Sequence, residues 1–335
     1  MTPPRKVLFA YDGTSGAKRA LDDLERNRPG LPNDIQVPVL CIADVWTAAR
    51  FASFGPYGLD AAPMMNTQLR TIQEVERTAL KDARKVALKA LEELHADHPG
   101  WEVTAESCVD APAWGIISRA EEWKADFIVM GSHGRSAAGR LVLGSVSQTV
   151  VREAACTVRV VHGRPSRRNE PVCLIVGFDG SPDAEAAVQA VAERVWPANS
   201  TVRLVTALGD PLCTAIPTLR WIAAHDDQKS TWTRRMIEDP VQRLRAAGLF
   251  VTPVVKRGDP RKILVGEAKR WDADSLFVGA RGLRGINRFL LGSVSTAVAM
   301  RASCPVEVVR LRENGISRMP VGKRTGAQPA AAGVK

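Results

Sequence analysis

Residues 131–147 read GSHGRSAAGRLVLGSVS and follow Phe127–Met130, an apolar run that is typical of a buried strand. The stretch places a glycine, two residues, a second glycine, nine residues and then Gly-Ser. The same spacing returns at residues 279–295, which read GARGLRGINRFLLGSVS. Two copies of one spacing, each directly after an apolar run, indicate a repeated strand–loop–helix unit.

Each copy has two features that suit an anion. Gly131 and Gly134 permit a tight turn after the strand, where backbone N–H groups can converge on a negative charge. Gly144 and Ser145 open an apolar helical run, and a helix start offers unpaired N–H groups to a phosphate. We therefore expect a phosphate chain between these two corners, near Arg135. The alternative is structural: the glycines only turn the chain, and Ser145 only caps the helix.

The start of each unit also repeats. Asp12-Gly13-Thr14 ends the first apolar run, and Asp179-Gly180-Ser181 ends an equivalent run 167 residues later. The glycine motifs are 148 residues apart, so the second unit is 19 residues shorter before its motif. Strands that alternate with helices in this way predict a mostly parallel sheet with right-handed crossovers.

We predict an α/β chain of two tandem Rossmann-like domains, each a five-stranded, mostly parallel sheet flanked by helices. The expected domains are residues 1–163 and 172–311, with a polar linker at 164–171. The first domain is expected to contain an irregular excursion at 46–66 and a long helix at about 67–97. Residues 312–335 are basic and lack periodicity, so we expect a disordered tail.

Composition excludes several classes of protein. The chain has 335 residues, of which 45% are apolar, enough for ordinary globular cores. No apolar run has the length of a membrane helix, and the N-terminus is unlike a secretory signal, so we expect a cytoplasmic protein. The six cysteines are scattered and indicate free thiols rather than disulfides or a metal site. A net charge of +10 could serve nucleic acid, but no aromatic–basic interleaving or helix-turn-helix pattern accompanies it, which disfavours that function.

Two other nucleotide-binding signatures are absent from the sequence. No Gly-x-Gly-x-x-Gly follows the first strand of either unit, which argues against a dinucleotide fold of that type. No Gly-x4-Gly-Lys-Ser/Thr is present, which argues against a P-loop enzyme.

With Gly-x2-Gly-x9-Gly-Ser after the fourth strand of a small α/β domain, the chain resembles the ATP-binding subgroup of the universal stress protein family. It is similar to a tandem member, over about residues 4–162 and 170–311. The resemblance implies the adenine nucleotide alpha hydrolase-like fold. It also implies ATP or a related adenine nucleotide as ligand, with Mg²⁺ as a candidate companion ion.

The resemblance further implies two nucleotide sites. The first would comprise Asp12, Gly13, Thr14 and Ile42 at the nucleoside, with Gly131, Ser132, Gly134, Arg135, Gly144, Ser145, Val146 and Ser147 at the phosphates. The second would comprise Asp179, Gly180, Ser181 and Ala207, with Gly279, Arg281, Gly282, Gly292, Ser293, Val294 and Ser295. Asp12 could instead only cap the helix after it. No residue is expected to be catalytic, because His133 and Ser132 are replaced by Arg281 and Ala280 in the second unit.

Three functions remain open on the sequence alone. We expect a module whose nucleotide state regulates partner contacts in a stress response. A weak ATPase or nucleotidyl-transferring enzyme is the first alternative, although no positioned general base is evident. A scaffold that binds no nucleotide is the second, and the intact glycine spacing in both units speaks against it.

Each domain ends in a short apolar strand, at 158–161 and 306–309. Unpaired apolar edges favour pairing, and in the resembled family such strands join two domains across a two-fold axis. We therefore expect an intramolecular pseudo-dimer, with a homodimer as a further possibility. Arg159 and Glu307 would face each other across antiparallel strands as an exposed ion pair that helps to set the register.

Overall fold

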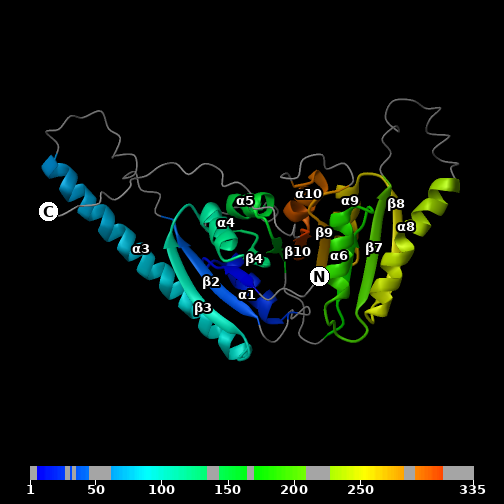
Figure 1. The fold of residues 1–335 in the computed structure, drawn as a ribbon, viewed down its shortest axis with the longest axis horizontal. Helices are drawn as coiled ribbons and strands as arrows, with labels where there is room; N and C mark the ends of the chain where they lie inside the picture. The colour runs from blue at the N-terminus through cyan, green and yellow to red at the C-terminus, as the bar shows by residue number, and fades with distance from the viewer. Residues whose placement is uncertain are drawn as a thin grey trace, which may run out of the picture.

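The computed structural model describes residues 6–26, 31, 35–44, 62–133, 143–163, 170–208, 227–282 and 291–311. Its strands form one ten-stranded sheet in the order β3-β2-β1-β4-β5-β10-β9-β6-β7-β8 (Figure 1). All neighbouring strands are parallel except β5 and β10, which are antiparallel. The predicted α/β architecture, with two five-stranded parallel halves, is therefore confirmed.

The two halves have the same order of elements. The first half contains β1 (Val7–Ala10), α1 (Ser15–Arg26), β2 (Gln36–Ala43), α3 (Ala62–Asp97), β3 (Glu102–Val109), α4 (Pro112–Glu122), β4 (Phe127–Gly131), α5 (Ser145–Glu153) and β5 (Thr157–Val161). The second half contains β6 (Cys173–Gly177), α6 (Pro182–Ala192), β7 (Thr201–Leu208), α8 (Asp227–Ala246), β8 (Phe250–Arg257), α9 (Pro260–Arg270), β9 (Ser275–Gly279), α10 (Ser293–Arg301) and β10 (Val306–Val309).

One predicted boundary was wrong. Helix α3 begins at Ala62, so residues 62–66, which we expected in an irregular excursion, are helical. Residues 46–61 of that excursion, 164–169 of the linker and the tail 312–335 lie outside the described residues. Within the described residues, no helix combines the length and the apolar character needed to cross a membrane.

Local sequence fixes where equivalent helices begin and end. Pro112 and Pro260 open α4 and α9, where a fixed φ suits the helix and the missing N–H would have had no helical partner. Lys124 and Asp272 follow these helices with φ of 55° and 48°. This left-handed conformation stops both helices at the same place, so the repeat in sequence is also a repeat of backbone structure.

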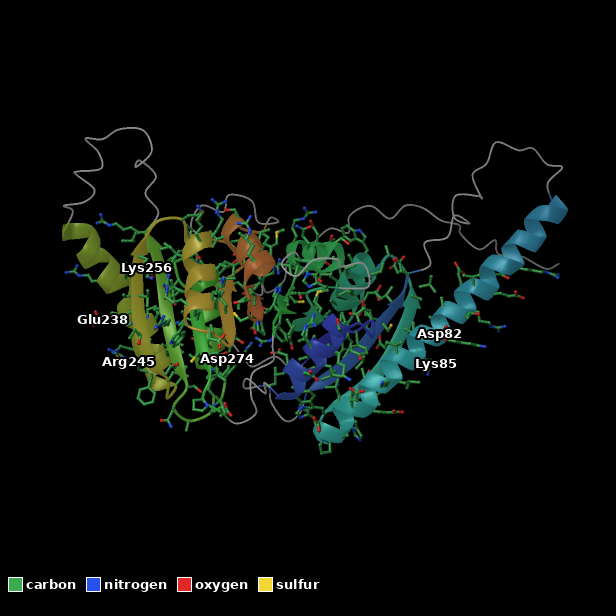
Figure 2. The ribbon with its side chains drawn as sticks, turned by 180° about the vertical axis from the view of Figure 1, so that it is seen from behind. Asp82, Lys85, Glu238, Arg245, Lys256 and Asp274 are labelled. Carbon is green, nitrogen blue, oxygen red and sulfur yellow. The ribbon has the colours of Figure 1, made fainter. Side chains whose placement is uncertain are left out.

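One aspartate in each half connects the starts of two neighbouring strands. Oδ2 of Asp126 accepts a hydrogen bond from the backbone N–H of Lys6 at 2.9 Å. Oδ2 of Asp274, labelled in Figure 2, accepts one from the backbone N–H of Cys173 at 2.7 Å. Each carboxylate thus ties the start of β4 or β9 to the start of the adjacent strand β1 or β6, which explains why this aspartate occurs in both halves.

Ion pairs between helix and sheet have opposite polarity in the two halves. In the first half, Arg119 of α4 makes two hydrogen bonds of 2.6 Å with the carboxylate of Glu106 on β3. In the second half, the equivalent position on α9 is Glu267, whose carboxylate binds Lys256 of β8 and Arg203 of β7 (Lys256 is labelled in Figure 2). Although burial opposes ionisation of Glu267, Lys256 and its cationic neighbours lower the pKa of that carboxyl.

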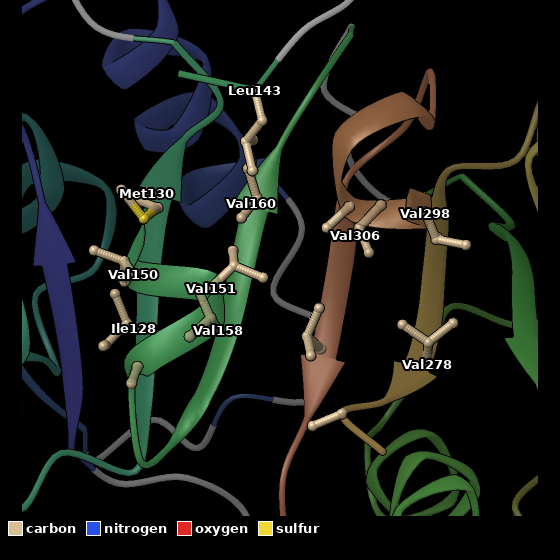
Figure 3. Close-up of a cluster of buried hydrophobic side chains, with 14 of the residues drawn as sticks. Ile128, Met130, Leu143, Val150, Val151, Val158, Val160, Val278, Val298 and Val306 are labelled. Carbon is tan, nitrogen blue, oxygen red and sulfur yellow. The ribbon is translucent and has the colours of Figure 1, made fainter. Parts of the chain in front are cut away.

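One face of the sheet carries a single hydrophobic core through both halves. Helices α4 and α5 contribute to it from the first half, and α9 and α10 from the second. Four valines of the joined strands lie within this core and have no exposed surface: Val158, Val160, Val306 and Val308. Figure 3 labels Val158, Val160 and Val306. Burial of these side chains stabilises each half and the junction together.

The opposite face has two separate cores, one under α1 and α3 and one under α6 and α8. Charged side chains lie between them. Arg159 and Glu307 are in register across β5 and β10, as predicted, but our expectation of an exposed pair was wrong because they are only 2% and 0% exposed. Burial alone would lower the pKa of Arg159, but the nearby charges of Asp23 and Glu307 raise it, so the guanidinium stays ionised.

Each half also binds the end of a helix in the other half. The guanidinium of Arg310, after β10, donates to the carbonyl oxygens of Val151 at 2.6 Å and Cys156 at 3.2 Å, at the end of α5. At the equivalent position after β5, His162 is buried and hydrogen-bonds the backbone of Ala299 in α10. These reciprocal contacts anchor the ends of α5 and α10 across the junction.

Lowering the pH from 7.5 to 5 should weaken folding through His162. Burial lowers the pKa of His162 from 6.5 to about 4, with a smaller contribution from the charge of His133. The unfolded chain therefore takes up a proton in this range that the folded chain excludes, so stability falls as the pH falls. The expected loss is about 2 kcal/mol in the free energy of unfolding, measured by denaturant titration.

The control is His162→Gln, which keeps a donor near Ala299 but cannot titrate. Its free energy of unfolding should fall less than that of the wild type over the same pH range. An identical pH dependence in the two proteins would contradict the assignment to His162.

Candidate functional site

A tight turn follows the first strand of each half. Oδ1 of Asp12 accepts hydrogen bonds from the backbone N–H and the hydroxyl of Thr14, at 3.0 and 2.6 Å. In the second half, Oδ1 of Asp179 accepts from the backbone N–H of Ser181 at 3.0 Å. Gly13 and Gly180 lie inside these turns with φ of 76° and 81°, a conformation that glycine adopts without steric cost. The predicted Asp-Gly-Thr/Ser triplets therefore form equivalent turns at the carboxyl ends of β1 and β6.

The turn lies against the loop that begins the glycine motif. The hydroxyl oxygen of Thr14 is 3.4 Å from the carbonyl oxygen of His133. In the second half, the hydroxyl of Ser181 donates to the carbonyl oxygen of Arg281 at 3.1 Å. The carboxyl ends of β1 and β4, and of β6 and β9, thus meet at one edge of the sheet, where open α/β sheets bind ligands.

The first glycine of each motif has a packing role. A Cβ added to Gly131 would lie 2.5 Å from the backbone carbon of Gly16, at the start of α1. A Cβ added to Gly279 would lie 2.5 Å from the backbone carbon of Asp183, at the start of α6. Distances below 3.0 Å cannot be accommodated without movement of the helix. These glycines allow a helix to start directly against the end of the strand, rather than only leaving room for a ligand.

The last serine of each motif is buried. The hydroxyl of Ser147 donates to the carbonyl oxygen of Gly131 at 2.9 Å, and that of Ser295 to the carbonyl oxygen of Gly279 at 2.5 Å. Gly144 is fixed in the same way, because its N–H donates to the carbonyl oxygen of Ser132 at 2.8 Å. These contacts hold the first turn of α5 and of α10 against the end of the preceding strand.

Within the described residues, the starts of α5 and α10 have no side-chain cap. The residues before them, Gly144 and Gly292, are extended and make no side-chain cap hydrogen bond to the first N–H groups. By contrast, α6 is capped by the hydroxyl of Ser181, which accepts from the N–H of Ala184. The first N–H groups of an α-helix have no partner within the helix. The starts of α5 and α10 therefore offer donors at the same sheet edge as the Asp-Gly turns.

The two sites differ at the second helical residue of α1 and its equivalent in α6. The first half has Gly16, where an added Cβ would lie 2.2 Å from the carbonyl oxygen of His133. The second half has Asp183, which is buried and accepts hydrogen bonds from Nε and the backbone N–H of Arg281, both at 2.9 Å. Arg281, which we predicted at the phosphates, is thus held by a carboxylate of its own half.

The predicted nucleoside residues lie at the ends of β2 and β7. Ile42 is the penultimate residue of β2, and its side chain approaches Gly115 of α4. Ala207 has the same place in β7. The long helices approach the turns: a Cβ added to Gly13 would meet Val86 of α3 at 3.2 Å, and one added to Gly180 would meet Met236 of α8 at 2.9 Å.

The structure therefore brings most of the predicted residues to one sheet edge in each half. Gly134 and Arg135 lie outside the described residues. Ser132 is buried, with its hydroxyl oxygen 2.9 Å from Nδ1 of His133. The part of the chain that the structure describes contains no group of three or more His, Cys, Asp or Glu side chains placed to hold a metal ion. Sequence reasoning missed Gly16 and Asp183, for which the only signal was a difference between the repeats.

Comparison with known proteins places the chain in a family. The profile of the universal stress protein family matches residues 4–162 and 174–310. A universal stress protein of Mycolicibacterium smegmatis is 32% identical over 265 residues, which cover 75% of this chain and 82% of that protein. One from Mycobacterium tuberculosis (strain ATCC 25618 / H37Rv) is 32% identical over 219 residues, covering 62% of this chain and 69% of that protein.

The fold is also similar to that of a solved structure. The crystal structure of a universal stress protein from Archaeoglobus fulgidus DSM 4304 matches with a TM-score of 0.57 at 20% identity, covering 91% of this chain and 98% of that one. The chain therefore belongs to the universal stress protein family and contains two domains of that family in tandem.

Alanine at the first glycine of either motif should destabilise the fold. Gly131→Ala and Gly279→Ala each place a Cβ against the backbone of α1 or α6, and such overpacking typically costs about 1–3 kcal/mol. The matched control is Gly266→Ala in α9, where an added Cβ would meet nothing within 4 Å. This control should stabilise the helix by about 0.5–1 kcal/mol. Denaturant unfolding measures all three, and equal stabilities would contradict the close approach.

Proposed function

We propose that each domain of this chain binds ATP or a related adenine nucleotide at the carboxyl edge of its parallel sheet, and that occupancy regulates contacts with partner proteins. The observation that carries this proposal is the uncapped start of α5 and of α10 beside an Asp-Gly turn. A helix start without a capping side chain leaves backbone donors for an external anion, and the helix dipole favours negative charge there.

The phosphates would bind the N–H groups of the first helical residues, Ser145 and Val146 in the first site and Ser293 and Val294 in the second. Ser145 and Ser293 are exposed, so their hydroxyls are accessible to the same ligand. The buried serines Ser147 and Ser295 act by holding the helix in place. Because the buried serines fix the helix start before a ligand arrives, the exposed donors are preorganised, which lowers the entropic cost of binding.

The nucleoside would lie over the turn between β1 and α1. Gly13 presents no side chain there, and the carboxylate of Asp12 is oriented by Thr14. Asp179, Gly180 and Ser181 provide the same surface in the second site. Adenine would contact the backbone at the ends of β2 and β7, near Ile42 and Ala207.

Mg²⁺ would enter with the nucleotide rather than as a resident ion. Proteins usually hold this ion through one or two carboxylates together with the phosphates of the ligand. The described residues offer isolated carboxylates at the site edge and no preassembled cluster, which fits that mode of binding.

We further propose that residues 1–163 and 172–311 act as two domains whose pairing through β5 and β10 persists in solution as an intramolecular pseudo-dimer. The support is the burial of both strands: valines fill one face of the junction, and charges that neutralise one another fill the other face.

ATP with Mg²⁺ should raise the melting temperature of the purified chain. A ligand that binds only the folded state stabilises it by about 2.7 kcal/mol at a hundredfold excess over Kd. A thermal shift titration with ATP, AMP and inorganic phosphate measures this and separates nucleotide from simple anion binding. An unchanged melting temperature at millimolar ATP would contradict the proposal.

Ser145→Pro should weaken nucleotide binding without disturbing the helix. Gly144 has φ of −63° and ψ of 153°, which suits the residue before a proline, and proline is favoured at the first helical position. The change removes one backbone donor, and loss of a hydrogen bond to a charged group should weaken binding by about 1.5–3 kcal/mol.

Ser145→Ala is the matched control because it removes the hydroxyl and keeps the N–H. Calorimetric titration of both variants and of Ser293→Pro would assign the loss to one site or the other. If Ser145→Pro and Ser145→Ala bind ATP equally well, the N–H of residue 145 is not a phosphate donor.

A further inference from the structure

Four charged side chains are buried together where the two halves join. Asp23 of α1, Arg159 of β5, Glu307 of β10 and Arg194, which follows α6, are 1%, 2%, 0% and 6% exposed. We call them the buried quartet. They lie on the sheet face covered by α1 and α6, away from the edge proposed for nucleotide, and the proposed function makes no use of them.

The quartet forms a row of alternating charges. Nε and Nη2 of Arg159 donate to the carboxylate of Asp23 at 2.7 and 3.0 Å. Nη1 of Arg159 is 3.5 Å from Oε2 of Glu307. The carboxylate of Glu307 accepts hydrogen bonds from Nη1 and Nη2 of Arg194 at 2.9 and 2.5 Å. The order of charges is negative, positive, negative, positive, and their sum is zero.

The row does not follow the symmetry of the repeat. Glu307 is the equivalent of Arg159, and Ala190 is the equivalent of Asp23. Each half contributes one acid and one base, but the first half places its base at the junction and the second half places its acid there. Two first halves joined through β5 would set two arginines side by side, and two second halves joined through β10 would set two glutamates side by side. Adjacent like charges away from water are strongly unfavourable.

The residues around the row also favour pairing of a first half with a second half. Nη2 of Arg159 donates to the hydroxyl oxygen of Ser275 in β9 at 2.9 Å. The equivalent residue of the first half is Phe127, so a second first half would present an apolar ring where this donor needs an acceptor. The guanidinium of Arg194 lies over the rings of Phe127 and Phe277, at 5.8 and 5.3 Å from their centroids.

We propose that the buried quartet selects the partner of each terminal strand: β5 accepts β10 and rejects a second β5, and β10 rejects a second β10. The partner that fits the β5 surface is therefore the second half of this same chain, supplied by its own chain or by another copy. Two chains can associate through these strands only reciprocally, first half to second half. The inference rests on the proposed pairing of the halves in solution and is independent of nucleotide binding.

Two full-length charge reversals test this selection. In Glu307→Arg the first half is unaltered, but the new arginine on β10 repels Arg159 of its own chain. In Arg159→Glu the second half is unaltered, but the new glutamate on β5 repels Glu307 of its own chain. Each variant alone should have the mass of one chain and a larger radius than the wild type. Their 1:1 mixture should show about twice that mass, because the intact first half of one chain pairs with the intact second half of the other. Light scattering after size exclusion measures mass, and small-angle scattering measures the radius.

The mixture remains informative even if a reversed half does not fold, because only the two unaltered halves need to pair. The control is Arg119→Glu mixed with Glu106→Arg, which reverses a partly exposed Arg–Glu pair away from the junction. That mixture should keep the mass of one chain. A triple variant combines Glu307→Arg with Asp23→Leu and Arg159→Met, which removes both quartet charges of the first half. Two such chains should then pair through their neutral β5 strands, so this variant should have the mass of two chains without any partner.

The proposal is overturned if either single reversal forms a two-chain species by itself as readily as the mixture does, since β5 in Glu307→Arg, or β10 in Arg159→Glu, would then accept its like. It is also overturned if both reversals keep the compact radius of the wild type, or if the neutral triple variant stays at the mass of one chain. A wild-type chain with an extended radius would overturn the pairing itself, whatever ATP does to its melting temperature.

Discussion

The antiparallel pairing of β5 with β10 is the constraint on which the rest of the structure depends. Each strand would otherwise be an open sheet edge, and each carries a charged side chain that becomes buried when the edge is closed. Burial of Arg159 and Glu307 requires the opposite charges of Asp23 and Arg194, which form ion pairs with them. Removing one member of such a group leaves an unpaired buried charge, which typically costs about 3–5 kcal/mol. At this junction, α1 and α6 lie on one face of the sheet and α5 and α10 on the other.

The candidate sites depend on close approach of backbone rather than on reactive side chains. Gly131 and Gly279 let α1 and α6 start against the ends of β4 and β9, and buried serines fix α5 and α10 in the same region. Within the described residues, these contacts leave backbone donors accessible at the sheet edge, and such donors suit a phosphate group.

Much of the fold could be predicted from the sequence because it depends on local sequence patterns. Apolar runs and the repeated glycine spacing predicted two parallel five-stranded halves, and the offset between the repeats predicted the register of Arg159 with Glu307. Burial of that pair could not be predicted from the sequence. It depends on Arg194, which binds Glu307 of β10 although the two residues are 113 positions apart. No sequence pattern indicates that these residues meet. The same holds for Asp183, whose contact with Arg281 joins segments that only the folded sheet brings together.

The opposite polarity of the ion pairs on α4 and α9 bears on how the halves can change. Arg119 pairs with Glu106 in the first half, whereas its equivalent Glu267 binds Lys256 and Arg203 in the second. A chimera with α9 in place of α4 would set the carboxylate of α9 against Glu106. Exchange of segments between the two copies by recombination would therefore produce repulsion within a domain. The two halves share one architecture but differ in the polarity of their ion pairs, so their segments are not interchangeable.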